Sequence, residues 1–126
     1  MRKVSATATA IAPMVMALID HSQIASAVAC AHDQDVTHGN IKPDNVLIRK
    51  TGEAVIADFG IAKASNRLNT ETRHGTLKGK IPYMSPEQCE GKQLDRRSDV
   101  YAIGIMLYEL TTGCRLYRGE SDFEIM

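Results

Sequence analysis

The sequence has no surplus of charge of either sign. Lysine plus arginine and aspartate plus glutamate each total 15, so the formal net charge at pH 7 is zero. Proteins that follow a nucleic-acid backbone usually carry a basic excess, because lysine and arginine neutralise the phosphates. The charge balance therefore argues against nucleic acid as a partner.

Cysteine is scarce, and the three cysteines are far apart, at positions 30, 89 and 114. An odd number without a C-x-x-C pair does not form a disulfide framework, which favours the reducing cytoplasm as the location. Cys30 lies near His32 and His38 in the sequence. Their spacing with Asp33 and Asp35 fits no standard zinc pattern, so we expect no metal site there.

Long apolar segments are missing as well. The most apolar stretch, residues 100–110, is shorter than the roughly 18 residues of a membrane-spanning helix. Arg2 and Lys3 precede a stretch that resembles a weak signal peptide, but small residues and threonines dilute its apolar core before Asp20. We expect neither a membrane span nor secretion.

The residues that are present fit one globular unit of 126 residues, 44% of them apolar. Pro13 suits the first turn of a helix, and apolar residues follow at helical spacing to about residue 34. A second helix is expected from Asp99 to about Thr112, with Ser98 as its N-cap and Gly113 at its end. Its apolar residues occupy more than one face, so this helix should be buried.

Between these two helices the sequence predicts a small β-hairpin. The runs at 46–48 and 54–57 have the composition of strands, and the connection at 49–53 contains Gly52, which suits a turn. Residues 65–80 are polar and show neither the helical nor the strand spacing of apolar residues, which indicates a surface loop. The expected fold class is therefore mainly α with a small β-hairpin.

Four short motifs follow one another in the order found in one known family. Residues 38–45 read HGNIKPDN and residues 58–60 read DFG, with the predicted hairpin between them. Residues 85–87 read SPE, and residues 99–104 read DVYAIG. Together they resemble the catalytic loop, the metal-binding motif, the A-P-E motif and the central buried helix of protein kinases. They are most similar to those of eukaryotic-like bacterial Ser/Thr kinases.

This resemblance implies a partial kinase C-terminal lobe. The domain would span residues 13–126 after an N-terminal tail at 1–12, with the catalytic loop at 38–45, the activation segment at 58–87 and the central buried helix at 99–112. Nothing upstream resembles the Gly-rich loop, strand lysine or partner glutamate that hold ATP in the family. We therefore expect that the N-lobe is absent and that the domain is truncated at residue 126.

The resemblance also implies chemical roles for single residues. Asp58 and Asn45 stand at the positions that bind Mg²⁺ and thereby ATP, and Lys42 stands at the position that approaches the transferred phosphate. Asn40 occupies the position of the catalytic aspartate, and an amide lacks the basicity to deprotonate a substrate hydroxyl. Mg²⁺ and ATP are the implied cofactors, and we expect this chain alone to bind them weakly.

Further residues stand at structural or regulatory positions of the family. We expect Asp99 to anchor the catalytic loop, and Glu87 to lack the arginine partner that it has in the family. Gly39 replaces an arginine that contacts a phosphorylated activation loop. The structural or regulatory positions are His38, Phe59, Gly60, Glu87 and Asp99. The candidate phosphosites are Thr70, Thr72 and Thr76.

Three interpretations of function remain open at this point. The first is a Ser/Thr protein kinase fragment, for which ATP-dependent phosphoryl transfer to protein is implied but impaired in this chain alone. The second is a pseudokinase-like binding module that presents its surface to a true kinase or to a protein substrate. The third is a non-functional remnant of a kinase gene, with exposed apolar surface around residues 100–110.

Overall fold

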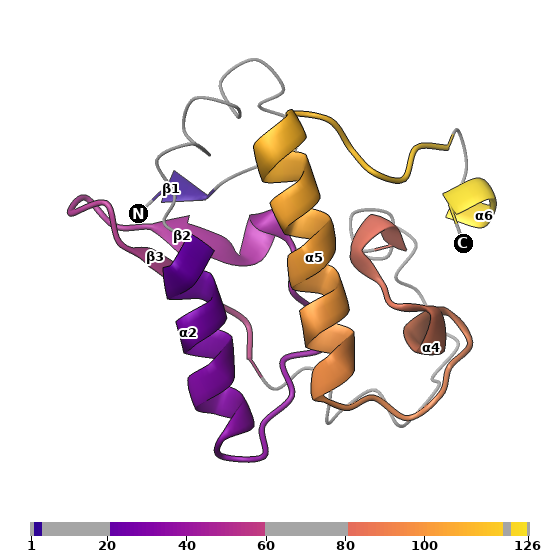
Figure 1. Ribbon diagram of the computed structural model, residues 1–126, viewed down its shortest axis with the longest axis horizontal. Helices are drawn as coiled ribbons and strands as arrows, with labels where there is room; N and C mark the ends of the chain where they lie inside the picture. Colours follow the sequence, from indigo (N-terminus) through magenta and orange to yellow (C-terminus); the bar gives the residue numbers. More distant parts are fainter. Residues whose placement is uncertain (1, 4–20, 60–80, 120–121, 126) are drawn as a thin grey trace.

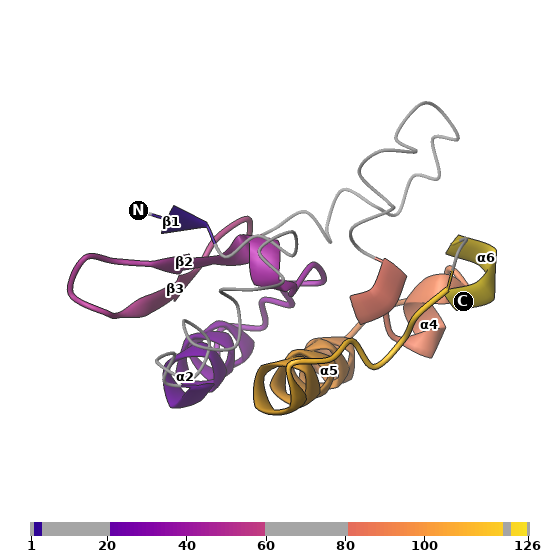
Figure 2. The same ribbon diagram turned by 90° about the horizontal axis from the view of Figure 1, so that it is seen from above.

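The computed structural model describes residues 2–3, 21–59, 81–119 and 122–125. Two long helices, α2 (His21–His32) and α5 (Arg96–Thr112), lie side by side and contact each other (Figure 1). In the view turned by 90°, the β-sheet lies over α2, whereas the short helices α4 (Pro86–Cys89) and α6 (Asp122–Ile125) lie on the side of α5 (Figure 2). The candidate site lies where these parts meet.

A three-stranded antiparallel sheet forms the second layer. β2 (Val46–Ile48) and β3 (Ala54–Ile56) make the expected hairpin. Gly52 in its turn has a φ of 89°, a conformation that favours glycine. β1 (Arg2–Lys3) pairs with β2, so the N-terminal tail expected at residues 1–12 contributes a strand to the sheet. The predicted fold class, mainly α with a small hairpin, is confirmed, with β1 added at the edge.

The central helix α5 begins three residues earlier than expected. Its N-cap is Asp95, whose Oδ1 accepts a hydrogen bond from the Arg97 backbone N–H at 2.8 Å. Aspartate caps helices as well as serine does, and its negative charge suits the positive end of the helix dipole. Ser98, the expected N-cap, instead lies inside the first turn and is buried. The helix ends as expected at Gly113, whose N–H donates to the Glu109 carbonyl at 2.9 Å.

One apolar core joins the two long helices and the sheet. Packing of this kind supplies most of the free energy that holds the layers together, because apolar surface leaves water. The buried members of this core are Ile24, Val28, Ile41, Val46, Ile56, Tyr83, Ala102, Ile105, Met106 and Leu110. Within the part of the chain that the structure describes, no helix is both long and apolar enough to cross a membrane.

Four short helical segments complete the described structure: η1 (Pro43–Asn45), η3 (Ile81–Tyr83), α4 (Pro86–Cys89) and α6 (Asp122–Ile125). Several sequence-based expectations lie outside the described residues. These are the helix start at Pro13, the loop at 65–80, Gly60 and the candidate phosphosites Thr70, Thr72 and Thr76.

Candidate functional site

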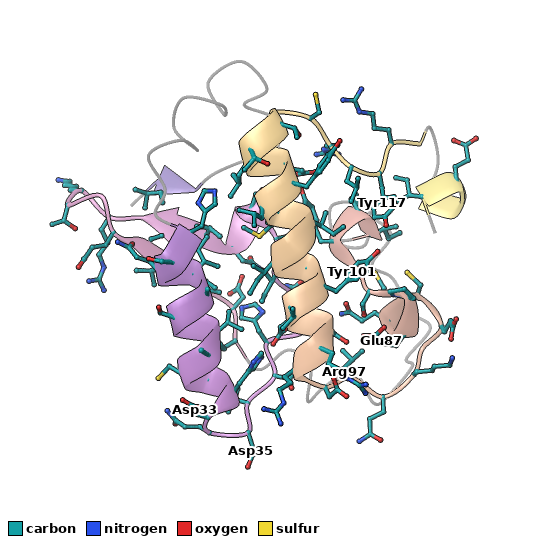
Figure 3. The ribbon with its side chains drawn as sticks, in the orientation of Figure 1. Asp33, Asp35, Glu87, Arg97, Tyr101 and Tyr117 are labelled. Atoms are coloured by element: carbon teal, nitrogen blue, oxygen red, sulfur yellow. The ribbon has the colours of Figure 1, made fainter. Side chains whose placement is uncertain are left out.

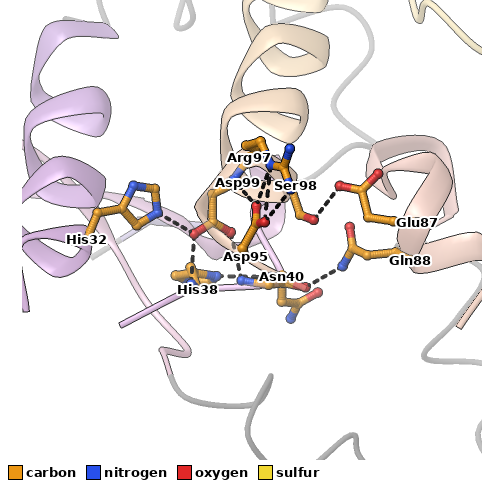
Figure 4. A network of polar contacts seen from close by, with 10 residues as sticks. His32, His38, Asn40, Glu87, Gln88, Asp95, Arg97, Ser98 and Asp99 are labelled. Atoms are coloured by element: carbon orange, nitrogen blue, oxygen red, sulfur yellow. Dashed lines mark hydrogen bonds and ion pairs between the residues drawn. The ribbon is translucent and has the colours of Figure 1, made fainter. Parts of the chain in front are cut away.

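Asp99, in the first turns of α5, holds the catalytic loop by its backbone. Its carboxylate is 1% exposed and accepts hydrogen bonds from the His38 and Gly39 backbone N–H groups, both at 2.8 Å (Figure 4). Two N–H donors on one carboxylate satisfy a buried charge that would otherwise be costly. Asp99 therefore contacts a loop residue that is 60 positions away in the chain.

His32 is a third partner of the same carboxylate. Its Nε2 lies 2.8 Å from Asp99 Oδ2, at the last turn of α2. Cys30 is exposed, and Asp33 and Asp35 lie at the surface where α2 ends (Figure 3). Among the described residues, no group of three or more histidine, cysteine or acidic side chains is arranged to hold a metal ion. The His32 side chain thus links α2 to α5 through Asp99.

His38 is fully buried and connects the catalytic loop to the residues before the DFG motif. Its Nδ1 accepts from the Asn40 N–H at 3.1 Å, so the neutral ring carries its proton on Nε2. That Nε2 donates to the Ala57 carbonyl at 2.8 Å. The His38 ring also meets the Phe59 ring edge-on, with centroids 4.4 Å apart. His38 therefore connects the catalytic loop to Ala57 and Phe59, the residues on either side of Asp58.

Asn40 is held by hydrogen bonds of its backbone, while its side-chain oxygen has no partner. Its backbone carbonyl oxygen accepts from Asn45 Nδ2 at 2.7 Å, whereas its side-chain Oδ1 is buried and has no hydrogen-bond partner. It lines a small cavity, with room for about one water molecule, between the catalytic loop, α4 and α5. A buried acceptor without a partner is unfavourable by about 1–3 kcal/mol.

Asn45 and Asp58 lie at the open end of the hairpin. The Ala57 N–H donates to the Asn45 carbonyl at 2.8 Å, which places Asp58 directly beyond the pairing with Asn45. Asp58 is exposed and has a left-handed φ of 62°. One carboxylate and one amide are oxygen donors of the kind that Mg²⁺ prefers, so the residues fit that ion. Lys42 is half-buried and lies on extended backbone just before Pro43.

Two residues of α4 connect the SPE motif to the rest of the site. Glu87 accepts a hydrogen bond from the Ser98 hydroxyl at 2.6 Å, and this bond lowers the pKa of the Glu87 carboxyl. We expected Glu87 to lack an arginine partner. Its partner in the described structure is the Ser98 hydroxyl. Gln88, which sequence reasoning did not single out, donates from Nε2 to the Gly39 carbonyl at 2.9 Å. The only sequence signal for Gln88 was its place in a capping box with Ser85.

A second polar pair lies near the C-terminal end of α5. The sequence analysis did not predict it. Tyr83 donates from its hydroxyl to Glu109 Oε2 at 2.6 Å, and Glu109 Oε1 is buried without a partner. Burial raises the pKa of the Glu109 carboxyl above its ordinary value. Burial, together with the hydrogen bond to Glu109, also raises the pKa of Tyr83.

The amino-acid sequence was compared with models of known protein families. The sequence pattern of the protein kinase domain matches residues 8–126. The chain belongs to the protein kinase family. The family resemblance that the four motifs indicated is confirmed. In the structure, the hydrogen bonds of Asp99, His38 and Asn45 connect these motifs to one another.

Three protein kinases are 41–45% identical to this chain over the aligned residues. The tyrosine-protein kinase MasK of Myxococcus xanthus is 45% identical over 92 residues, 73% of this chain and 14% of MasK. The serine/threonine-protein kinase PrkC of Bacillus subtilis is 44% identical over 103 residues, 82% of this chain and 16% of PrkC. The probable serine/threonine-protein kinase PknB of Corynebacterium glutamicum is 41% identical over 103 residues, 81% of this chain and 16% of PknB. The chain therefore spans about one sixth of the length of these relatives.

Proposed function

We propose that this chain carries the catalytic-loop and metal-binding part of a Ser/Thr protein kinase site, in which Asn40 impairs phosphoryl transfer. The observation that supports this most directly is the amide at position 40, within a loop that Asp99 and His38 hold in place. General-base catalysis contributes roughly 10² to 10⁴ in rate. Loss of the base in an otherwise ordered loop would therefore leave a slow reaction at most.

Asn45 and Asp58 would hold Mg²⁺ in this proposal. The metal, bound together with ATP, would supply neutralisation of the phosphate charge. Lys42 would add a cation beside the transferred phosphate. Lys42 also favours serine or threonine as the acceptor, because tyrosine kinases usually differ at this position. The relatives named above include enzymes described as tyrosine kinase and as serine/threonine kinase, so the acceptor itself is part of the proposal.

A phosphate-transfer assay tests this function. Purified chain with Mg²⁺, labelled ATP and a generic Ser/Thr protein substrate is expected to give no more labelled product than Asp58→Ala does. Asp33→Ala, at an exposed residue outside the site, is the matched control for a removed aspartate. Robust transfer by the unaltered chain and by Asp33→Ala, but not by Asp58→Ala, would contradict the proposed impairment.

A pseudokinase-like binding module is the second candidate, and the outer face of α5 favours it. Val100, Leu107 and Tyr108 are 62%, 43% and 40% exposed. Together with Gly104 they recur at helical spacing on one face. Exposed apolar patches of this kind occur at protein interaction sites and in aggregation-prone chains. The partner would be a true kinase or a protein substrate.

Thermal unfolding followed by circular dichroism separates this module from a non-functional remnant. A module is expected to melt in one cooperative transition, because a packed core unfolds as a unit. A remnant is expected to form aggregates that show no transition. A cooperative melt therefore contradicts the remnant, and its absence contradicts the module.

A further inference from the structure

The side chain of Gln88 joins two segments through its two polar atoms. Its Oε1 accepts from the Ser85 backbone N–H at 3.0 Å, which caps the start of α4, and also from the Ser85 hydroxyl at 3.3 Å. Its Nε2 donates to the Gly39 carbonyl at 2.9 Å, 49 residues away (Figure 4). Because both ends of the amide are used, the Gln88 side chain bridges α4 and the catalytic loop.

Gly39 is held from both sides. Its N–H donates to Asp99 Oδ1, and its carbonyl accepts from Gln88. Gly39 has a φ of 72° and no side chain to restrict its backbone. Because glycine has no side chain to limit its backbone angles, the two hydrogen bonds limit them instead. They thereby orient the peptide that leads into Asn40.

The contacts form a closed ring of three elements. Asp99 joins α5 to the catalytic loop, Gln88 joins the loop to α4, and the Ser98–Glu87 hydrogen bond joins α4 back to α5. Residues of all three elements line the small cavity beside Asn40. A movement of α4 changes at least one of these bonds, and the Gln88 bond is the one that reaches the loop beside Asn40.

We propose that Gln88 is a positioning residue that couples the end of the SPE segment to the catalytic loop, by holding the Gly39 peptide and with it the orientation of Asn40. When α4 is displaced, the bond from Nε2 breaks and Gly39 becomes free to change its backbone angles. The coupling does not require phosphoryl transfer, so it stands or fails independently of the proposed function.

Two substitutions separate the loop contact from the helix cap. Gln88→Glu keeps an acceptor for the Ser85 N–H, because glutamate also closes a capping box. At neutral pH its carboxylate cannot donate to the Gly39 carbonyl. Gln88→Ala removes both contacts. The effect of losing the loop contact alone is therefore measured in Gln88→Glu.

Amide hydrogen exchange followed by NMR measures the loop directly. In Gln88→Glu at pH 7, we expect protection of the Gly39 and Asn40 amides to fall by about tenfold, the order of one lost hydrogen bond. The amides of residue 88 and Cys89, which donate to the Ser85 carbonyl, are expected to keep their protection. Unchanged protection at Gly39 and Asn40, or an equal loss throughout the chain, would overturn the proposal.

The pH dependence of Gln88→Glu supplies a signature that a purely structural role does not give. As the pH falls and the new carboxyl gains a proton, it can donate to the Gly39 carbonyl again. Protection at Gly39, corrected for intrinsic exchange, and the ¹³C shift of its carbonyl are expected to return toward the unaltered values. Gln88→Ala should show no such return. Absence of recovery in Gln88→Glu would count against Gln88 as the positioning group.

Discussion

Asn40 has backbone contacts that do not depend on its side chain. Its N–H donates to His38 and its carbonyl accepts from Asn45. Aspartate and asparagine have nearly the same shape, so either residue allows the loop to form these two bonds. The residue type at position 40 therefore changes the chemistry of the site while the path of the loop stays the same.

Glu109 is a residue whose charge state affects the stability of the fold. Its half-buried carboxyl accepts from Tyr83 through one oxygen, and the other oxygen has no partner. Burial raises the pKa of Glu109 above its ordinary value of 4.5. The folded state thus holds the proton more tightly than the unfolded state, which favours folding at low pH.

We expect the stabilising effect of the Glu109 proton to be complete below pH 4.5 and lost as the pH rises through the raised pKa. Glu109→Gln keeps an acceptor for Tyr83 and removes the charge. The melting temperature of Glu109→Gln minus that of the unaltered chain should therefore increase from pH 4.5 to pH 7. Thermal melts across this range measure the difference. Glu53→Gln, at an exposed residue of the hairpin turn, should show no such trend. A constant difference between Glu109→Gln and the unaltered chain would contradict the expected pKa shift.

The two faces of α5 meet different surroundings. Its buried residues are Ser98, Asp99, Ala102, Ile105, Met106 and Leu110. Gly104 lies on the opposite, exposed face, and a Cβ added there would meet nothing within 4 Å. Glycine inside a helix is less favourable than alanine because its unfolded backbone has more freedom. The helix therefore has a site where a larger residue fits at no steric cost.

Gly104→Ala is expected to raise the free energy of unfolding by about 0.5–1 kcal/mol. Gly52→Ala is the matched control, because its added Cβ also meets nothing within 4 Å. The φ of 89° at Gly52 is unfavourable for alanine, so this variant should lose about 1 kcal/mol. Urea unfolding followed by circular dichroism measures both. Changes of the same sign would contradict this explanation.

At the scale of the whole molecule, Asp99 connects the parts that the core packs together. It lies on α5 and binds the catalytic loop, while His32 reaches it from α2. Tyr101, two residues further along α5, shares a hydrogen bond with Tyr117 in the segment after the helix (Figure 3). Burial and this bond raise the pKa of Tyr101 to about 12. The helix thus links early and late segments of the chain.

Asp99→Ala should lower the free energy of unfolding by roughly 3–5 kcal/mol, because the His38 and Gly39 amides would remain buried without an acceptor. Asp33→Ala, at an exposed residue after α2, should change it by less than about 0.5 kcal/mol. Equilibrium unfolding in urea gives both values. A loss below 1 kcal/mol for Asp99→Ala would show that the loop amides have other partners.

Much of the local structure could be predicted from the sequence. The hairpin has strand composition on both sides of Gly52, and α5 ends at Gly113, because these signals act over a few residues. The start of α5 could not be fixed in this way, since Asp95 and Ser98 are both good N-caps. In the structure Asp95 accepts from the Arg97 N–H as the N-cap, while the Ser98 hydroxyl donates to Glu87 in another element.

The sequence by itself determined the family, the order of its motifs and the amide at position 40, because these depend on residue identity alone. The tertiary structure decided which side chains hold the site together. Gln88 reaches Gly39 across 49 residues, and Tyr83 reaches Glu109 across 26. Such partners are set by the packing of α4, α5 and the catalytic loop, and no local spacing in the sequence encodes them.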